Sequence, residues 1–187
     1  MRIIAGKFRG RRLKTINSNL VRPTTDRARQ AIFDTLSARM DFEGALALDC
    51  FAGSGLLGFE ALSRGAQKVT FVEQNPQVAR HIAQSIQLLN VESQAELRLM
   101  DAMRFVAETN ERYHLIFADP PYDFRLYDKF LRKIFERHLL LPDGYLILEH
   151  HEREKFDGRE RFAFQKNFGS TVVSFFALDE VPESQSI

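Results

Sequence analysis

Hydrophobic and polar positions follow two alternating patterns from about residue 45 onward. Short apolar runs stand at 45–50, 68–73, 95–100, 113–118 and 145–149. Between them, apolar residues recur at helical spacing at 56–63, 76–89, 102–108 and 126–138. Short apolar runs are typical of buried parallel strands. Their regular alternation with helices predicts a parallel sheet that is covered by helices on both faces.

The last third of the chain departs from this alternation. Pro142-Asp143-Gly144 predicts a turn directly before the strand 145–149. Two further runs, 161–166 and 171–178, flank Asn167-Phe168-Gly169, which predicts the turn of a β-hairpin. We therefore expect antiparallel strands at one edge of the sheet.

The segment that precedes the first strand carries most of the positive charge. Residues 1–30 hold nine Lys and Arg and one acid, whereas the rest of the chain holds 17 basic and 24 acidic residues. The net charges are therefore +8 and −7. Glycines at positions 6 and 10 predict a small hairpin of 2–5 with 11–14, and Thr24 or Thr25 is expected to cap a helix. The charge indicates a polyanion bound at this end, with a solubilising terminus as the alternative.

Length and composition limit the class of protein. The 187 residues, 44% of them hydrophobic, predict one domain, with a basic extension over 1–40 and a core over 45–187. Neither an apolar run of 18 residues nor an apolar signal core is present, so we expect no membrane span and no secretory signal. The single cysteine, Cys50, fits a reducing cytoplasm and a buried structural position. Adjacent His150 and His151 point opposite ways on an extended segment, so no metal site is predicted.

A glycine-rich loop follows the first strand. Gly53, Gly55 and Gly58 form G-x-G-x-x-G between a strand and a helix, and Glu73 ends the next strand twenty positions after Gly53. The glycines let the backbone approach a ligand closely, and the acid can accept hydrogen bonds from ribose hydroxyls. This pattern predicts a nucleoside-containing cofactor. By itself it leaves NAD and S-adenosylmethionine (SAM) open.

The strand 113–118 ends in Asp119-Pro120-Pro121-Tyr122. Proline cannot continue a central strand, so the chain turns across the sheet edge and leaves the two proline carbonyls as unpaired acceptors. Asp119 adds a side-chain acceptor, and Tyr122 offers a flat aromatic face. Such a cluster can hold an amino group while the ring that carries it stacks on Tyr122. An amino-methyltransferase needs this arrangement and a hydride-transfer enzyme does not, which favours SAM.

Asp119–Tyr122 resembles the (Asn/Asp)-Pro-Pro-(Tyr/Phe) motif of class I SAM-dependent amino-methyltransferases, and 49–58 resembles their SAM-binding motif. The block from Gly6 to Leu13 (GKFRGRRL) and the block from Arg22 to Phe33 (RPTTDRARQAIF) resemble the RsmD family of bacterial 16S rRNA guanine-N2 methyltransferases. The resemblance implies a Rossmann-like fold with a mostly parallel seven-stranded sheet. It also implies an enzyme that methylates one guanine of 16S rRNA in an assembled or partly assembled 30S subunit. We expect this enzyme to be a cytoplasmic monomer. S-adenosylhomocysteine would be the other product.

The expected site residues form three groups. The catalytic group is Asp119, Pro120, Pro121 and Tyr122. The cofactor group is Asp49, Phe51, Ala52, Gly53, Ser54, Gly55, Glu73, Asp101, Ala102, Arg22 and Thr24. Within it, Asp101 is expected to meet the adenine amino group or to cap the helix that follows, and the resemblance places Arg22 and Thr24 near the methionine end of SAM. The RNA-binding group, expected to contact phosphates, is Arg9, Arg11, Arg12, Lys14 and Arg27.

Three other functions compete with this interpretation. An adenine-N6 or cytosine-N4 methyltransferase acting on DNA or RNA would use the same four catalytic residues, but the chain has no room for a separate target-recognition domain. An NAD-dependent oxidoreductase is disfavoured by the acceptor cluster, and a non-catalytic ribosome-assembly factor is disfavoured by the intact motif. The choice of guanine rests on the N-terminal resemblance and not on Asp119–Tyr122.

Overall fold

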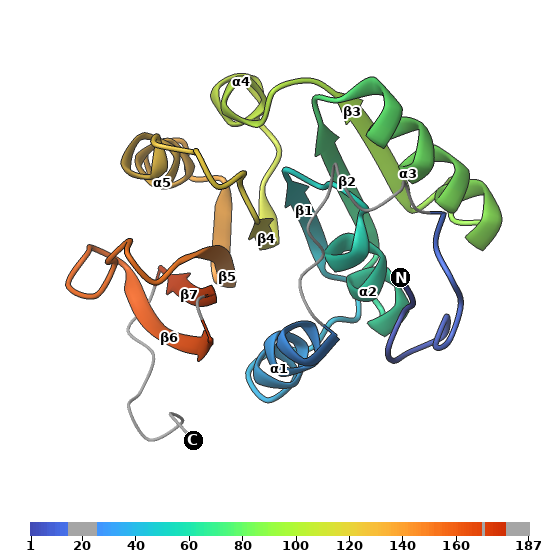
Figure 1. Cartoon of the computed structure of the whole chain (residues 1–187), viewed down its shortest axis with the longest axis horizontal. Helices are drawn as coiled ribbons and strands as arrows, with labels where there is room; N and C mark the ends of the chain where they lie inside the picture. The colour runs from blue at the N-terminus through green and yellow to red at the C-terminus, as the bar shows by residue number, and fades with distance from the viewer. Residues whose placement is uncertain (15–25, 170, 179–187) are drawn as a thin grey trace.

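The structure, a computed structural model, describes residues 1–14, 26–169 and 171–178. At its centre is a seven-stranded sheet with the order β3-β2-β1-β4-β5-β7-β6 (Figure 1). The strands are Leu46–Cys50 (β1), Lys68–Glu73 (β2), Ala95–Leu99 (β3), Tyr113–Ala118 (β4), Leu140–His151 (β5), Phe162–Phe168 (β6) and Thr171–Ala177 (β7). The first five in the sheet order are parallel, and β7 is antiparallel to both of its neighbours. The predicted parallel sheet with an antiparallel edge is therefore confirmed.

Helices cover both faces of this sheet (Figure 1). They are Asp26–Ser37 (α1), Leu56–Arg64 (α2), Pro76–Leu89 (α3), Ala102–Glu108 (α4) and Tyr127–Glu136 (α5). One apolar cluster fills the space under α1, α2 and α3, and a second fills the space under α4 and α5. Along β4, Leu115 and Phe117 enter the first cluster, whereas Ile116 and Ala118 enter the second. Burial on both faces explains why this strand is a continuous apolar run. Among the described residues, no helix is long and apolar enough to cross a membrane.

Residues 1–14, here called the N-terminal arm, pack against α2 and α3. The predicted hairpin is reduced to one antiparallel bridge, Arg2 with Arg12. Gly6 lies so close to α2 that a Cβ atom would stand 1.8 Å from the carbonyl oxygen of Ser63. The Ser63 hydroxyl also accepts a hydrogen bond of 2.9 Å from the amide of Phe8. The arm is thus part of the folded structure.

The prediction that a turn at 142–144 precedes a strand that begins at Tyr145 is wrong. The strand begins at Leu140, and its register against β4 shifts, so that Tyr113 pairs with Leu140 but Leu115 pairs with Tyr145. The extra β5 residues form a bulge, in which Asp143 has a φ of 61°. The turn residues therefore interrupt the ladder without ending the strand.

Two other elements, β6 and α5, end at residues that differ from those predicted. Phe168 pairs with Thr171, so Asn167 and Phe168 belong to β6 and the reversal begins later than expected. Phe168 packs against the first apolar cluster, which favours its place in the strand. The helix expected over 126–138 ends at Glu136. The predicted cap at Thr24 or Thr25 lies outside the described residues.

Candidate active site

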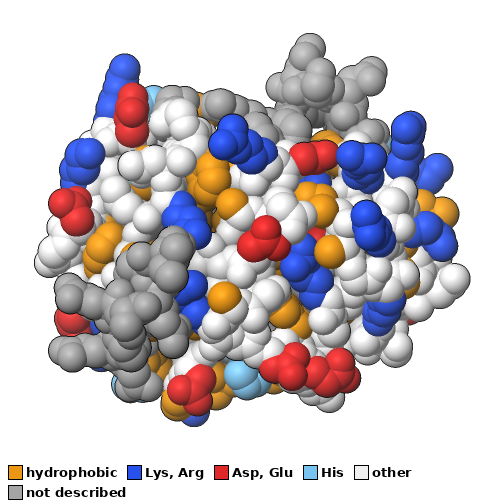
Figure 2. Space-filling model, turned by 90° about the horizontal axis from the view of Figure 1, so that it is seen from below, with side chains coloured by type: hydrophobic (Ala, Val, Ile, Leu, Met, Phe, Trp, Pro, Cys, Tyr) orange, Lys and Arg blue, Asp and Glu red, His pale blue; other side chains and the backbone are white. Residues whose placement is uncertain are grey.

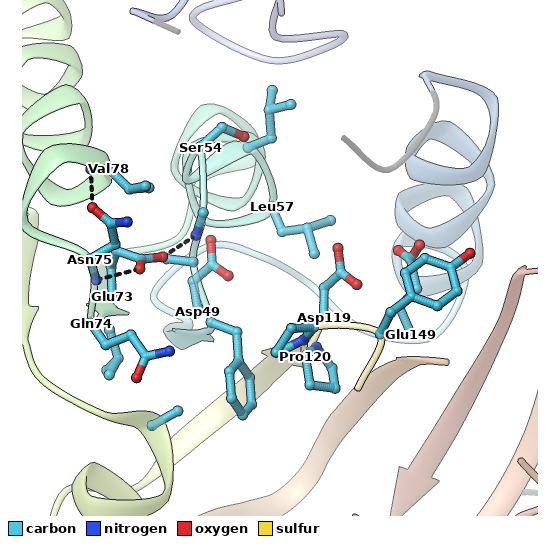
Figure 3. A pocket seen from close by; sticks show the side chains of 18 of the residues that line it. Asp49, Ser54, Leu57, Glu73, Gln74, Asn75, Val78, Asp119, Pro120 and Glu149 are labelled. Atoms are coloured by element: carbon cyan, nitrogen blue, oxygen red, sulfur yellow. Dashed lines mark hydrogen bonds between the residues drawn. The ribbon is translucent and has the colours of Figure 1, made fainter. Parts of the chain in front are cut away.

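A pocket of about 340 Å³ opens at the carboxyl ends of the parallel strands. This is where ligands bind in open α/β sheets, and the volume is within the usual range for ligand sites. Most of the predicted catalytic and cofactor residues line it (Figure 3): Asp49, Phe51, Ala52, Gly53, Ser54, Glu73, Ala102, Asp119, Pro120, Pro121 and Tyr122. The fold therefore brings two segments 70 residues apart into one cavity.

The loop between β1 and α2 turns sharply because several residues adopt positive φ. Phe51 has a φ of 57°, Gly53 of 53° and Gly55 of 74°. Glycine adopts this conformation freely, whereas Phe51 needs support from its surroundings. Its ring packs against Phe124 at a centroid distance of 5.2 Å. Further along, a Cβ atom on Gly58 would lie 2.3 Å from the ring of Phe71, so only glycine lets α2 approach the sheet this closely.

Glu73 ties the glycine loop to the end of β2. Its Oε2 accepts from the amide of Gly53 at 2.9 Å, and its Oε1 accepts from the amide of Asn75 at 2.8 Å. A carboxylate has about four lone-pair sites, so these bonds leave acceptor capacity toward the pocket. Glu73 is thus fixed in orientation at the position where the sequence predicts a ribose acceptor.

Asp49 is a buried acid of the pocket with a strongly raised pKa. Its Oδ2 accepts from the amide of Gly58 at 2.9 Å, and its side chain is buried. Burial raises the pKa of Asp49 to about 8, the Gly58 hydrogen bond opposes this, and the negative charge of Glu73 adds to it. A bound cation would shift the equilibrium toward the ionised carboxylate. Binding of a positively charged ligand beside Asp49 would therefore be coupled to ionisation of this acid.

Asp119 leaves the sheet at the end of β4. Pro120 is buried and Pro121 is exposed. The Pro121 carbonyl, which we predicted to be an unpaired acceptor, accepts from the amide of Phe124 at 2.9 Å. That bond closes the turn, so the prediction that the Pro121 carbonyl is unpaired is wrong, whereas Pro121 itself lines the pocket. The side chain of Asp119 and the carbonyl of Pro120 remain as the candidate acceptors of the motif.

Tyr122 stands at the open side of the pocket and is 63% exposed. Its ring meets that of His151 edge to face, with a centroid distance of 6.0 Å. This contact leaves a large part of the Tyr122 ring accessible, as stacking on a base requires.

Sequence reasoning missed the wall that β5 and β7 supply. This wall consists of Glu149, His150, His151 and Thr171. The other lining residues that were missed are Leu56, Leu57, Val72, Gln74, Asn75, Val78, Met100 and Tyr127. The available signal was the acid that follows the apolar run of β5, because parallel strands end at the same edge of a sheet.

Burial also shifts the pKa of His150 in this wall and of Tyr127 of α5, which lines the pocket as well. His150 is held by Ser174 Oγ at 2.8 Å and by the carbonyl of His151 at 3.0 Å, and burial lowers the pKa of His150. Burial, with the negative charges of Glu154 and Asp119, raises the pKa of Tyr127 to about 12. Burial therefore favours the neutral form of both side chains.

Several predicted cofactor residues do not line the pocket. Gly55 is the N-cap of α2. Asp101 is exposed, and its carboxylate caps α4 by accepting from the amide of Arg104 at 2.8 Å. Its neighbours Met100 and Ala102 line the pocket instead. Arg22 and Thr24 lie outside the described residues.

The predicted RNA-binding residues lie away from the pocket lining. Those of the arm are exposed, as is Arg27 in the first turn of α1. Arg11 also has a structural contact, because its Nη2 donates to the carbonyl of Leu88 at 2.9 Å. The arm holds six Lys and Arg and no acid, and Figure 2 shows blue side chains gathered at the right of the face seen there.

Comparison with known proteins relates this geometry to a family. The family model described as Conserved hypothetical protein 95 matches residues 1–177. The "Ribosomal RNA small subunit methyltransferase D" of Haemophilus influenzae is 35% identical over 178 residues, which cover 94% of this chain and 91% of the relative. The protein of the same name from Escherichia coli is 34% identical over 80% of this chain and 74% of its own length. A solved E. coli structure, "Putative methyltransferase yhhF", has a TM-score of 0.83 at 28% identity and covers 94% of this chain and 96% of its own. The expected class I methyltransferase fold is confirmed.

Proposed function

The chain belongs to the Conserved hypothetical protein 95 family, the RsmD family, and we propose that it transfers a methyl group from SAM to the exocyclic N2 amine of a guanine in small-subunit rRNA. The observation that carries the proposal is the shared pocket, in which the glycine loop with Glu73 faces the Asp119-Pro120 acceptors and the exposed ring of Tyr122. The names of the relatives support rRNA of the small subunit as the substrate. The base and its nitrogen are our assignment.

The pocket residues suit SAM. Glu73 keeps acceptor capacity for the ribose hydroxyls, and the buried carboxylate of Asp49 favours the positive charge of the methionine end. The bound SAM supplies an electrophilic methyl group on a sulfonium. Leu57 and Val72 give the pocket apolar surface.

The β4 motif would hold the acceptor. An exocyclic amine is a poor nucleophile because its lone pair is delocalised into the ring. Acceptance of its N–H bonds by the Asp119 carboxylate and the Pro120 carbonyl would orient the lone pair and stabilise the positive charge that develops on nitrogen. Tyr122 would stack on the base, which must be flipped out or single-stranded to enter. The proton then leaves the cationic product through Asp119 or water.

The N-terminal arm would contact the RNA backbone. Its six basic side chains supply affinity without sequence readout. Because Ile4 and Ala5 donate to Glu60 of α2, the helix that begins at the glycine loop, phosphates bound by the arm would be held at a fixed position relative to the pocket. An assembled or partly assembled small subunit is the proposed substrate.

Tritiated SAM offered with small-subunit particles, free rRNA and DNA tests the proposal, with nucleoside analysis of the product. We expect label in N2-methylguanine. Label only in N6-methyladenine or N4-methylcytosine would contradict the guanine assignment, and transfer to no nucleic acid would favour an assembly factor.

Asp119→Ala should reduce transfer by about 100- to 1000-fold while SAM still binds, because an acceptor used mainly in the transition state is removed. The matched control is Asp123→Ala, since Asp123 is exposed in the same loop and does not line the pocket. Substantial turnover by the Asp119 variant would contradict its role.

A further inference from the structure

The end of β5 places a second carboxylate beside Asp119. Ala118 of β4 pairs with Leu148 of β5, so Asp119 and Glu149 are the next residues on two neighbouring parallel strands. Such strands lie about 4.8 Å apart. Ala118 and Leu148 enter the cluster under α4 and α5. Since side chains alternate along a strand, the next residues point to the face of α1 and α2, as Figure 3 shows for both carboxylates.

Glu149 lies on the side of the pocket away from the cofactor residues. The glycine loop and Glu73 follow β1 and β2, whereas Glu149 follows β5, with β4 between them. The Tyr122–His151 ring contact joins the β4 motif to the same end of β5. Glu149 therefore borders the space in which a base would stack on Tyr122.

His150, the next residue of β5, makes its hydrogen bonds within the sheet. Both ring nitrogens of His150 have partners within the sheet, Ser174 and the carbonyl of His151. Glu149 is half-buried and lines the pocket, and its two oxygens provide about four acceptor sites. At the end of β5, Glu149 therefore presents a carboxylate to the pocket.

We propose that Glu149 selects guanine by accepting the N1–H of the target base while Asp119 and Pro120 hold its N2 amine, an inference that rests on the proposed function. Guanine carries N1–H and N2–H donors on one edge. Adenine and cytosine carry an unprotonated ring nitrogen beside their amine, and its lone pair would face the carboxylate. A buried acceptor with no donor opposite it is costly, so Glu149 would reject both bases. It is a specificity-determining residue that adjoins the catalytic motif.

The test uses 2,6-diaminopurine, which keeps the 2-amino group but lacks N1–H. This base replaces the target guanine, by ligation of a synthetic RNA segment, in the RNA or particle that the wild-type protein methylates. We expect the wild type to prefer guanine by at least about 100-fold in kcat/KM. In Glu149→Gln, whose amide can donate to an unprotonated N1, the preference should fall below about tenfold. SAM affinity should stay within about threefold, because Glu149 lies outside the cofactor half.

Glu152→Gln is the matched control, since Glu152 is exposed and does not line the pocket. It should keep the wild-type preference. If Glu149→Gln does not fold, Glu149→Asp replaces it and should lower kcat/KM for guanine by about tenfold or more without admitting diaminopurine.

The possible failures are distinguishable. Absence of guanine methylation by the wild type contradicts the proposed function. Guanine methylation with an unchanged base preference in Glu149→Gln overturns the present inference alone. Loss of SAM binding in that variant also overturns it, because Glu149 would then belong to the cofactor site.

Discussion

Glu60 of α2 is the buried carboxylate on which the N-terminal arm depends. Its Oε2 accepts from the amide of Ile4 at 2.8 Å, and its Oε1 accepts from the amide of Ala5 at 3.0 Å and from Arg64 Nε at 3.1 Å. The buried guanidinium of Arg29 lies 3.9 Å from the same carboxylate. Glu60→Gln keeps the size of the side chain but replaces one acceptor oxygen with a donor. One arm amide then faces a donor, and Arg29 loses its nearest buried negative charge.

The cost of Glu60→Gln can be estimated from these contacts. A buried amide left without an acceptor costs about 1–3 kcal/mol, and a hydrogen bond to a charged group contributes about 1.5–3 kcal/mol. Removing the partner of a buried charge costs about 3–5 kcal/mol, part of which is the same loss. We therefore expect a decrease of about 3 kcal/mol in the free energy of unfolding. For a chain of 187 residues this corresponds to a fall in Tm of about 6–12 °C.

Urea unfolding followed by circular dichroism measures this loss, and limited trypsin digestion reports release of the arm at Arg9, Arg11 and Arg12. Glu108→Gln is the matched control, because Glu108 also pairs with an arginine four residues away but is exposed. Its stability and cleavage pattern should match those of the wild type. A loss below about 1 kcal/mol in Glu60→Gln, or arm cleavage no faster than in the control, would refute the reasoning.

Three further predictions concern charge and stacking. The folded pKa of Asp49, about 8, exceeds its unfolded value of 3.8, so the ligand-free protein should lose stability as pH rises from 4 to 8. Asp49→Asn should reduce the dependence of the free energy of unfolding on pH by at most about 1.4 kcal/mol per pH unit. If the urea midpoints of the wild type and of Asp49→Asn change equally with pH, the prediction is contradicted. Tyr122→Ala should weaken RNA binding by about 1–3 kcal/mol whereas Tyr122→Phe should not, as measured by KM, and equal effects would exclude stacking. The double substitution Arg9→Gln and Arg12→Gln should reduce the slope of the logarithm of the RNA-binding constant against the logarithm of salt concentration by about 1.4. An unchanged slope in a filter-binding assay would show that these two side chains do not contact RNA phosphates.

The strands were predicted well where burial is complete on both faces. The runs 68–73 and 113–118 coincide with β2 and β4, because a residue with a polar or turn preference bounds each of them. The start of β5 was misplaced, because Pro142-Asp143-Gly144 has the composition of a turn. In the fold these residues form a bulge beside β4, where a Cβ atom on Gly144 would lie 2.6 Å from the carbonyl oxygen of His114. This close approach involves a residue 30 positions away, which local composition cannot show.

The candidate site was predictable where it consists of contiguous motifs. Asp49, Glu73 and Asp119 line the pocket because each lies at the carboxyl end of a recognisable strand, within β1, at the end of β2 and directly after β4. Asp101 caps α4, which is one of the two roles expected for it, whereas the carbonyl of Pro121, expected to be unpaired, closes its own turn. Such local hydrogen bonds compete with ligand binding, and residue type alone does not show which of the two prevails.

The strand order explains why the choice of base was the least predictable property. Asp49 pairs with Phe117 across β1 and β4, so the cofactor loop and the acceptor motif leave the sheet from neighbouring strands. This adjacency follows from the strand order alone. Glu149 reaches the same cavity from β5, on the other side of β4. If it reads N1–H, base selection can change by substitution on β5 while the groups that hold SAM and the amine stay in place. A motif confined to β4 would then predict the reaction but not the base.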